Sequence, residues 1–438
     1  VYYGVDNTGN TRVWECSKIL THVVVTAMMK SVNVANSDRS GEELDCMHVK
    51  TDTTEHPLPP DRSKSWDQLT YSLEQSTKVD SKLIPNICLK DIFSRSRTME
   101  DCNNTGNSYN TFPKRRLRII ELGSGMAALP SLALAAVATA LGMMQMNNVE
   151  SSNHLLDSND NNCAVPYMDI VVTDGHPKSV ANNKICSKLT LDLHNDKKTT
   201  DEGTDRTPET CSFSFTSSSK EKGEEYEDGN KDPSHLKKAL FCSIETKQLL
   251  WKASDEGRME CQSLIQRCRK NDDIITNEDD NYLDYFDLVL VSDCIHFTEF
   301  HAGLITTIGR LLRVNGLCLL CQPKRGSSLD QFIQLITAIN DSHDDCDGGS
   351  DGDHDNSSTR TNSISNESKR GPLFDSRLYH DYSKHISNQH QDLLKRQDDK
   401  VYDPNIHYPL ILELKKLREY NEDVDTRFAL HHVKQRER

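Results

Sequence analysis

The sequence has 438 residues, of which 35% are hydrophobic, and its net charge is −15. This length allows a large core and two or three domains, but the low apolar fraction and the abundant Asn, Asp and Ser place much of the chain outside a core. No apolar run is long enough to span a membrane and no basic run stands out, so we expect neither a membrane nor a nucleic-acid partner.

The negative charge is concentrated in three segments. Residues 195–235 carry 11 acids against 6 bases, residues 271–285 carry 6 acids and no base, and residues 341–360 carry 7 acids and one base. The rest of the chain is close to neutral, so we expect these segments to be solvated loops and not an acidic binding face. The 14 cysteines are scattered and no signal-peptide pattern opens the chain, which favours the cytoplasm or the nucleus.

The first predicted strand, at 117–122, runs into a turn that contains Glu121, Gly123 and Gly125. The two glycines let the backbone approach a ligand closely, and the helix predicted at 129–142 presents its free N–H groups to the same point. This is what a fold needs to hold a nucleoside cofactor at the end of a first parallel strand. An acid just before the first glycine, such as Glu121, is typical of S-adenosylmethionine sites, where it faces the methionine end of the cofactor.

The second predicted strand, at 168–173, is followed by Asp174 and Gly175 and then by a helix at about 177–193. In nucleoside-binding sheets a carboxylate at this position accepts hydrogen bonds from the ribose hydroxyls, and the alternative role for Asp174 is a helix N-cap. A less regular third strand, at 240–251, ends at Trp251, which could stack on an adenine or simply pack in the core.

The fourth predicted strand, at 286–292, ends at Ser292 and Asp293 and is followed by a helix at about 299–312. Ligands of open α/β sheets bind at the carboxyl ends of the strands. Asp293 could therefore orient the attacking amine of a substrate or line the cofactor, and the alternative is a helix cap. His296 is a candidate general base, although a lone His near a strand end is more often structural.

The fifth predicted strand, at 316–323, contains Cys318 and Cys321 and is followed by a helix at about 328–339. Residues three apart on a strand point to opposite faces, so these thiols cannot meet at one metal and are expected in the core. Lys324 and Arg325 come next and either flank the active-site edge or form a solvated surface pair. No His, Cys and Asp cluster has the spacing of metal ligands, so no metal is predicted.

Apolar strands that alternate with helices indicate a Rossmann-like, three-layer αβα fold with a parallel sheet covered on both faces. A last apolar run, at 408–414, is expected to pair at or near an edge of this sheet. Long polar segments separate the predicted elements, and we interpret them as disordered insertions into one domain that covers 1–438. These insertions lie at about 31–113, 144–166, 195–236 and 341–400.

Taken together and in this order, the motifs resemble the seven-β-strand, S-adenosylmethionine-dependent protein lysine methyltransferases. Four blocks, at 5–14, 286–297, 323–332 and 402–410, are similar to the calmodulin-lysine N-methyltransferases within that group. The resemblance implies a seven-stranded class I methyltransferase sheet, S-adenosyl-L-methionine as the cofactor, calmodulin as the protein substrate, and a monomer.

Position by position, the resemblance implies that Asp293 is the catalytic residue and that the residues after it border a channel for the substrate lysine. In the family an aromatic residue usually stands three positions after this Asp, whereas here His296 takes that place and Phe297 follows. The implied channel residues are His296, Phe297, Lys324 and Arg325. The implied cofactor contacts are Trp14, Glu121, Gly123, Gly125, Asp174, Gly175, Trp251 and Ser292.

The implied reaction is direct displacement at a sulfonium methyl group by a neutral lysine amine. Burial in an apolar channel lowers the pKa of the amine, so a dedicated general base is not needed. Two alternatives are methylation of a different protein lysine and a non-catalytic protein that binds the cofactor. A nicotinamide-dependent oxidoreductase is disfavoured, because the third glycine of the dinucleotide fingerprint is missing.

Overall fold

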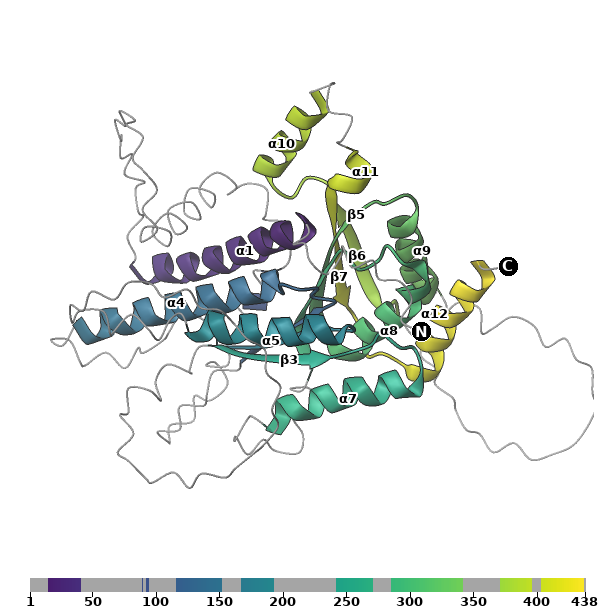
Figure 1. The fold of residues 1–438 in the computed structure, drawn as a ribbon, viewed down its shortest axis with the longest axis horizontal. Helices are drawn as coiled ribbons and strands as arrows, with labels where there is room; N and C mark the ends of the chain where they lie inside the picture. The colour runs from purple at the N-terminus through teal and green to yellow at the C-terminus, as the bar shows by residue number, and fades with distance from the viewer. Residues whose placement is uncertain are drawn as a thin grey trace, which may run out of the picture.

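The computed structural model describes residues 15–40, 89, 92–93, 116–151, 167–192, 242–270, 285–341, 371–395 and 403–436 (Figure 1). Its strands are β1 Leu117–Leu122, β2 Met168–Asp174, β3 Cys242–Gln248, β4 Phe286–Ser292, β5 Leu312–Pro323, β6 Phe374–Tyr379 and β7 Pro409–Lys416. Its helices are α1 Glu15–Ser40, α4 Leu129–Ser151, α5 Pro177–Asp192, α7 Asp255–Lys270, α8 His301–Leu311, α9 Ser328–Asp341, α10 Lys384–Lys395, α11 Pro404–His407 and α12 Glu422–Arg436, with a short 3-10 turn, η6, at Thr298–Phe300.

The strands form one seven-stranded sheet in the order β3-β2-β1-β4-β5-β7-β6. Strands β1 to β5 are parallel, and β7 pairs antiparallel with both β5 and β6. The chain therefore proceeds from the central β1 to β2 and β3 on one side, and later to β4 and β5 on the other. Such a reversal of strand order is where open α/β sheets bind their ligands.

Successive residues of the strands point to opposite faces of the sheet, so they contribute to two separate hydrophobic cores. Ile119 of β1 and Leu288 of β4 face the core that includes α1 and α4. Ile120 and Val289, one residue further on, face the core that includes α7, α8, α9 and α12. The predicted Rossmann-like, three-layer fold with seven strands is confirmed (Figure 1).

Three of the expected insertions contain regular structure. Helix α1 extends to Ser40 and α4 extends to Ser151, so both helices enter segments that were expected to be disordered. Within 341–400 the structure has β6 and α10, and the expectation was wrong there. β6 lies at the edge of the sheet and is only partly buried, so its sequence lacks the apolar run of a central strand. Leu89, Ile92 and Phe93, within 31–113, are buried in the core on the α1 face of the sheet, and most other residues of these insertions lie outside the described residues.

The connections between elements differ at the two edges of the sheet. At the carboxyl ends of β1 to β5, short turns that the structure describes lead into the next helix. The stretches outside the described residues that separate helices from strands instead lead into the amino ends of strands. These stretches are 94–115, 152–166, 193–241, 271–284 and 342–370. β6 runs in the same direction as β5, so all five meet the sheet at the same edge.

Candidate functional site

The turn after β1 needs glycine at two positions. Gly123 and Gly125 have φ angles of 66° and 61°, a region that residues with a side chain rarely adopt. A Cβ atom added at Gly123 would lie 2.5 Å from the sulfur of Cys294 and 2.8 Å from the ring of Trp251. At Gly125, in contrast, no heavy atom of the other described residues lies within 4 Å of that position, its two chain neighbours aside. The turn is therefore closely packed at its first glycine and open at its second.

Asp174 joins the end of β2 to this turn. Its carboxylate accepts a hydrogen bond from the Gly125 amide at 2.8 Å and another from the His176 amide at 2.7 Å. Burial raises the pKa of Asp174, and the two amide donors oppose this. The Ser179 side chain, in the first turn of α5, opposes it as well, so the carboxylate contacts both the glycine turn and the start of that helix.

Two neighbouring asparagines of α5 hold the same turn, and the sequence analysis did not identify either. The Asn183 side chain, fully buried, donates to the Ser124 hydroxyl at 2.7 Å and to the Gly125 carbonyl at 2.8 Å. Asn182 donates to the carbonyl of Met126. Their contacts bridge more than 50 residues of chain, so nothing in the local sequence indicates them.

Glu121 is a buried acid directly beneath the start of α4. Its side chain accepts a hydrogen bond from the Ser131 amide at 3.1 Å, and its second oxygen has no partner among the described residues. Burial raises the pKa of Glu121 to about 7. A buried acceptor without a partner beside an open glycine turn fits a cofactor that brings its own donor, as an α-amino group does.

Trp251 lies where the turn after β3 meets the turn after β1. Its ring packs against Gly123 and it also contacts the core on the α8 face of the sheet. Both interpretations of this residue, a wall of the cofactor site and a core residue, describe part of its surroundings. Gly175 lies nearby, next to the side chain of Leu250.

Asp293 follows β4 with a positive φ angle of 54°, and its amide donates to the Cys321 carbonyl at 3.0 Å. Its carboxylate is 4% exposed and accepts hydrogen bonds from Gln322 at 3.1 Å and from Arg325 at 2.7 Å. Burial raises the pKa of Asp293, and the positive charge of Arg325 opposes this. The following 3-10 turn begins after Phe297 without a side-chain cap, so Asp293 is not a helix cap.

Side chains from three elements surround Asp293. The hydroxyl of Ser292 lies 2.8 Å from that of Ser17, so α1 reaches this edge of the sheet. The ring of His296 packs against that of Phe297 at a tilt of 46°, with the ring centres 3.8 Å apart, and its Nδ1 lies 3.3 Å from the Asp293 carbonyl. Burial lowers the pKa of His296, which keeps the ring neutral near pH 7.

Lys324 and Arg325 do not act as a pair. Arg325 is 24% exposed and turned inward to Asp293, whereas Lys324 is 47% exposed and lies 3.6 Å from Asp330. The solvated-surface interpretation therefore describes Lys324 and is wrong for Arg325. Both border a surface pocket lined by Lys324, Arg325, Gly326, Asp403 and Asn405.

The remaining predictions concern cysteines, metals and Trp14. Cys318 and Cys321 are buried in the two different cores, so the prediction that they face opposite sides of the sheet is confirmed. Among the described residues, no three His, Cys, Asp or Glu side chains are grouped as metal ligands would be, and no helix could cross a membrane. Trp14 lies just outside the described residues.

The sequence around Asp293 is similar to known proteins. Residues 272–339 match a lysine methyltransferase family model. A 56-residue stretch is 43% identical to a calmodulin-lysine N-methyltransferase from Arabidopsis thaliana, and it covers 12% of this chain and 18% of that relative. The match to the family model includes β4, α8 and β5, which carry Asp293 and Arg325.

Solved structures also align with the chain at low similarity. An rRNA methylase from Streptococcus thermophilus aligns with a TM-score of 0.26 and 8% identity, over 69% of this chain and 89% of that one. The plantazolicin methyltransferase BpumL in complex with SAH aligns with a TM-score of 0.23 and 10% identity, over 69% and 76%.

The family match, on a Rossmann-like sheet with an open glycine turn, supports an S-adenosylmethionine-dependent methyltransferase. S-adenosylmethionine is the cofactor that such an enzyme uses. The buried, unpartnered oxygen of Glu121 and the space beside Gly125 among the described residues are compatible with this cofactor.

Proposed function

We propose that this protein is a protein-lysine N-methyltransferase and that calmodulin is its substrate. The observation that carries the first part is the family match at 272–339, because it includes Asp293 at the carboxyl end of β4. The second part is supported by the short Arabidopsis match and by the four blocks that resemble calmodulin-lysine methyltransferases.

In the proposed site, Gly123, Gly125 and Asp174 hold the nucleoside part of the cofactor and Glu121 holds its amino group. Trp251 forms one wall, with Trp14, Gly175 and Ser292 as further contacts. The bound cofactor supplies a methyl group on a sulfonium centre. The protein's own contribution is to fix the position of the substrate and to exclude water.

Asp293 is proposed to orient the lysine that receives the methyl group. Gln322 and Arg325 hold its two oxygens and fix their direction, and His296 and Phe297 border the channel. Burial of the lysine lowers the pKa of its amine, so its proton leaves to water before transfer. The neutral nitrogen then attacks, and His296 is not required as a base.

The test is mass spectrometry of unmethylated calmodulin after incubation with this protein and S-adenosylmethionine. We expect mass gains of about 14 Da on one lysine-containing peptide, and their loss in the Asp293→Asn variant, which keeps the size of the side chain. Calmodulin that gains no mass while another protein lysine does would refute the substrate. No transfer to any protein, with cofactor binding intact, would favour the non-catalytic alternative.

A further inference from the structure

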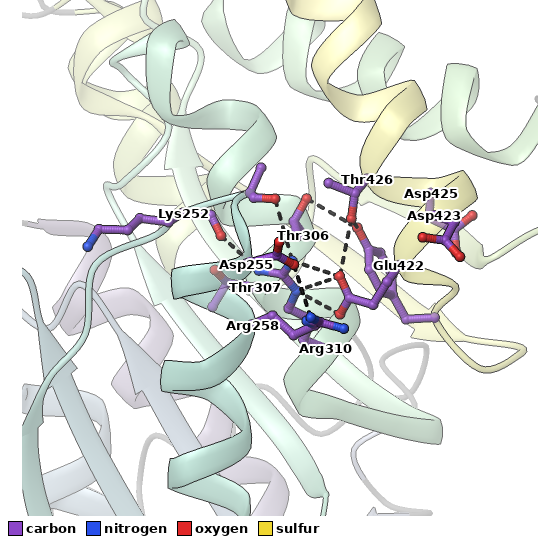
Figure 2. A network of polar contacts seen from close by, with 12 residues as sticks. Lys252, Asp255, Arg258, Thr306, Thr307, Arg310, Glu422, Asp423, Asp425 and Thr426 are labelled. Atoms are coloured by element: carbon purple, nitrogen blue, oxygen red, sulfur yellow. Dashed lines mark hydrogen bonds and ion pairs between the residues drawn. The ribbon is translucent and has the colours of Figure 1, made fainter.

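A buried arginine ties the C-terminal helix to the turn that carries Trp251. Arg310 of α8 is 5% exposed and pairs with Glu422, the first residue of α12, through contacts of 2.9 and 2.7 Å (Figure 2). Its third nitrogen donates to the backbone carbonyl of Lys252 at 2.8 Å, and a longer contact of 3.5 Å reaches the carbonyl of Ala253. One guanidinium therefore joins α8, α12 and the turn after β3.

The arginine also meets an unusual need of this turn. The Lys252 and Ala253 carbonyls lie between β3 and α7, where they are not part of a strand ladder or a helix. A buried carbonyl without a donor is costly, and a charged, bidentate arginine is a strong donor. We conclude that Arg310 fixes the path of the backbone directly after Trp251.

A second contact with α8 fixes the position of Trp251 itself. A Cβ atom at Gly303 would lie only 2.2 Å from the Trp251 carbonyl, so the helix and the turn touch through backbone alone. The Trp251 ring then reaches Gly123 on its other side. Two points on α8, Gly303 and Arg310, therefore determine where the ring lies relative to the glycine turn.

We propose that Arg310, held by Glu422, is a positioning residue that sets the affinity of the cofactor site by fixing Trp251 against the glycine turn. This inference rests on the proposed function, because it takes Trp251 as a wall of the cofactor site. It links the site to α12, more than 150 residues further along the chain.

The experiment is a double-mutant cycle that measures the dissociation constant of S-adenosylhomocysteine by calorimetry. The variants are Arg310→Gln, Trp251→Ala and the two combined. If Arg310 acts through Trp251, each single variant weakens binding by about tenfold and the double variant is no weaker than Trp251→Ala alone. Methyl transfer by Arg310→Gln should show a raised KM for S-adenosylmethionine and an unchanged kcat at saturation.

The matched control is Arg418→Gln. Arg418 also makes a bidentate pair with a buried carboxylate of α12, Asp425, with both contacts at 2.8 Å, and donates to a backbone carbonyl, that of Gly371. These partners belong to α12 and to the start of the β6 segment and not to the turn after β3, so the affinity of the Arg418→Gln variant for S-adenosylhomocysteine should stay near wild type. An equal loss in this control would overturn the proposal.

Gly303→Ala covers the case in which Arg310→Gln does not fold. This variant removes no charge and pushes the Trp251 carbonyl directly, so it should weaken binding in the same way. Wild-type affinity in Gly303→Ala or Arg310→Gln, or additive losses in the double variant, would overturn the positioning role. Absence of binding by the wild-type protein would instead overturn the proposed function.

Discussion

Glu121 combines a structural cost with a proposed role in binding. The folded protein holds a proton on this carboxyl up to pH 7, whereas in the unfolded chain the carboxyl ionises near its ordinary value of 4.5. The stabilising contribution of the protonated form is therefore complete below about pH 4.5 and is lost as the pH rises to about 7. Above that range the folded protein carries a buried negative charge, and the contacts described for it come from Ser131.

Replacing Glu121 by Gln should have opposite effects on stability and binding. We expect the free energy of unfolding at pH 8 to rise by up to about 3 kcal/mol, with no gain at pH 4, because Gln cannot ionise. Affinity for S-adenosylhomocysteine should fall, since the amino group loses its carboxylate. Urea unfolding at both pH values and calorimetry test this, and Glu245→Gln on β3 is the control. A gain that does not depend on pH would contradict the explanation.

Both oxygens of the Asp174 carboxylate should be needed for binding of the cofactor. Asn keeps one acceptor and turns a donor toward one of the two amides, so Asp174→Asn should weaken binding of S-adenosylhomocysteine by about 10- to 100-fold. Asp169→Asn is a matched control at the other end of β2, where Asp169 contacts Arg116 and Ser243. Similar affinities in the two variants would remove Asp174 from the site.

At the scale of elements, α8 joins β4 to β5, and the carboxyl end of this helix depends on one side chain. Lys416, the last residue of β7, is fully buried and donates to the carbonyls of Gly309 and Leu312 at 2.9 and 2.6 Å. Burial lowers the pKa of Lys416. The amine satisfies backbone acceptors that the end of a helix leaves open.

Lys416→Met should therefore destabilise the protein although Met fills a similar volume. We expect a loss of about 2 to 4 kcal/mol in the free energy of unfolding, because two buried carbonyls lose their donor. Lys415→Met changes the neighbouring residue, which is only partly buried, and should cost less than 1 kcal/mol by comparison. Urea denaturation of the two variants tests this, and equal losses would refute the capping role.

The elements that could be predicted from the sequence are those that their own residue pattern identifies, without knowledge of the elements that pack beside them. β1 and β4 have the predicted bounds, because every residue of both is buried and their hydrophobic side chains form nearly continuous runs. These runs are interrupted by Arg118 and Glu121 in β1 and by Asp287 and the final Ser292 in β4. β6 was missed because its exposed positions break that run. In the site, Asp174 and Asp293 follow strand ends and could be predicted. Asn183 and Arg310 could not, since their partners are brought to them only by the packing of helices.

At the scale of the whole molecule, charge and site are arranged unevenly. The three acidic segments carry more negative charge than the chain's net −15, and the described core is close to neutral. If calmodulin, which is acidic, is the substrate as proposed, its docking would depend on local positive charge near Asp293. Arg325 is engaged with Asp293, which leaves Lys324 as the more exposed of the two basic residues.

Charge reversal at Lys324 should slow methylation without removing it. We expect Lys324→Glu to lower kcat/KM for calmodulin by several-fold at low ionic strength and by less at 0.5 M salt, because screening weakens the repulsion. Lys188→Glu, on the exposed surface of α5, is the control. A loss that persists at high salt would indicate damage to the site instead of weaker docking.

All five stretches that lead into the amino ends of strands meet the sheet at the edge opposite to Asp174 and Asp293. The site is built from short turns at the other edge. A reporter domain or an affinity label joined at the end of α5 or at the start of β3 would therefore be attached at the edge of the sheet opposite to the proposed site. The same arrangement would let these connections change in length without moving the turns that carry Asp174 and Asp293.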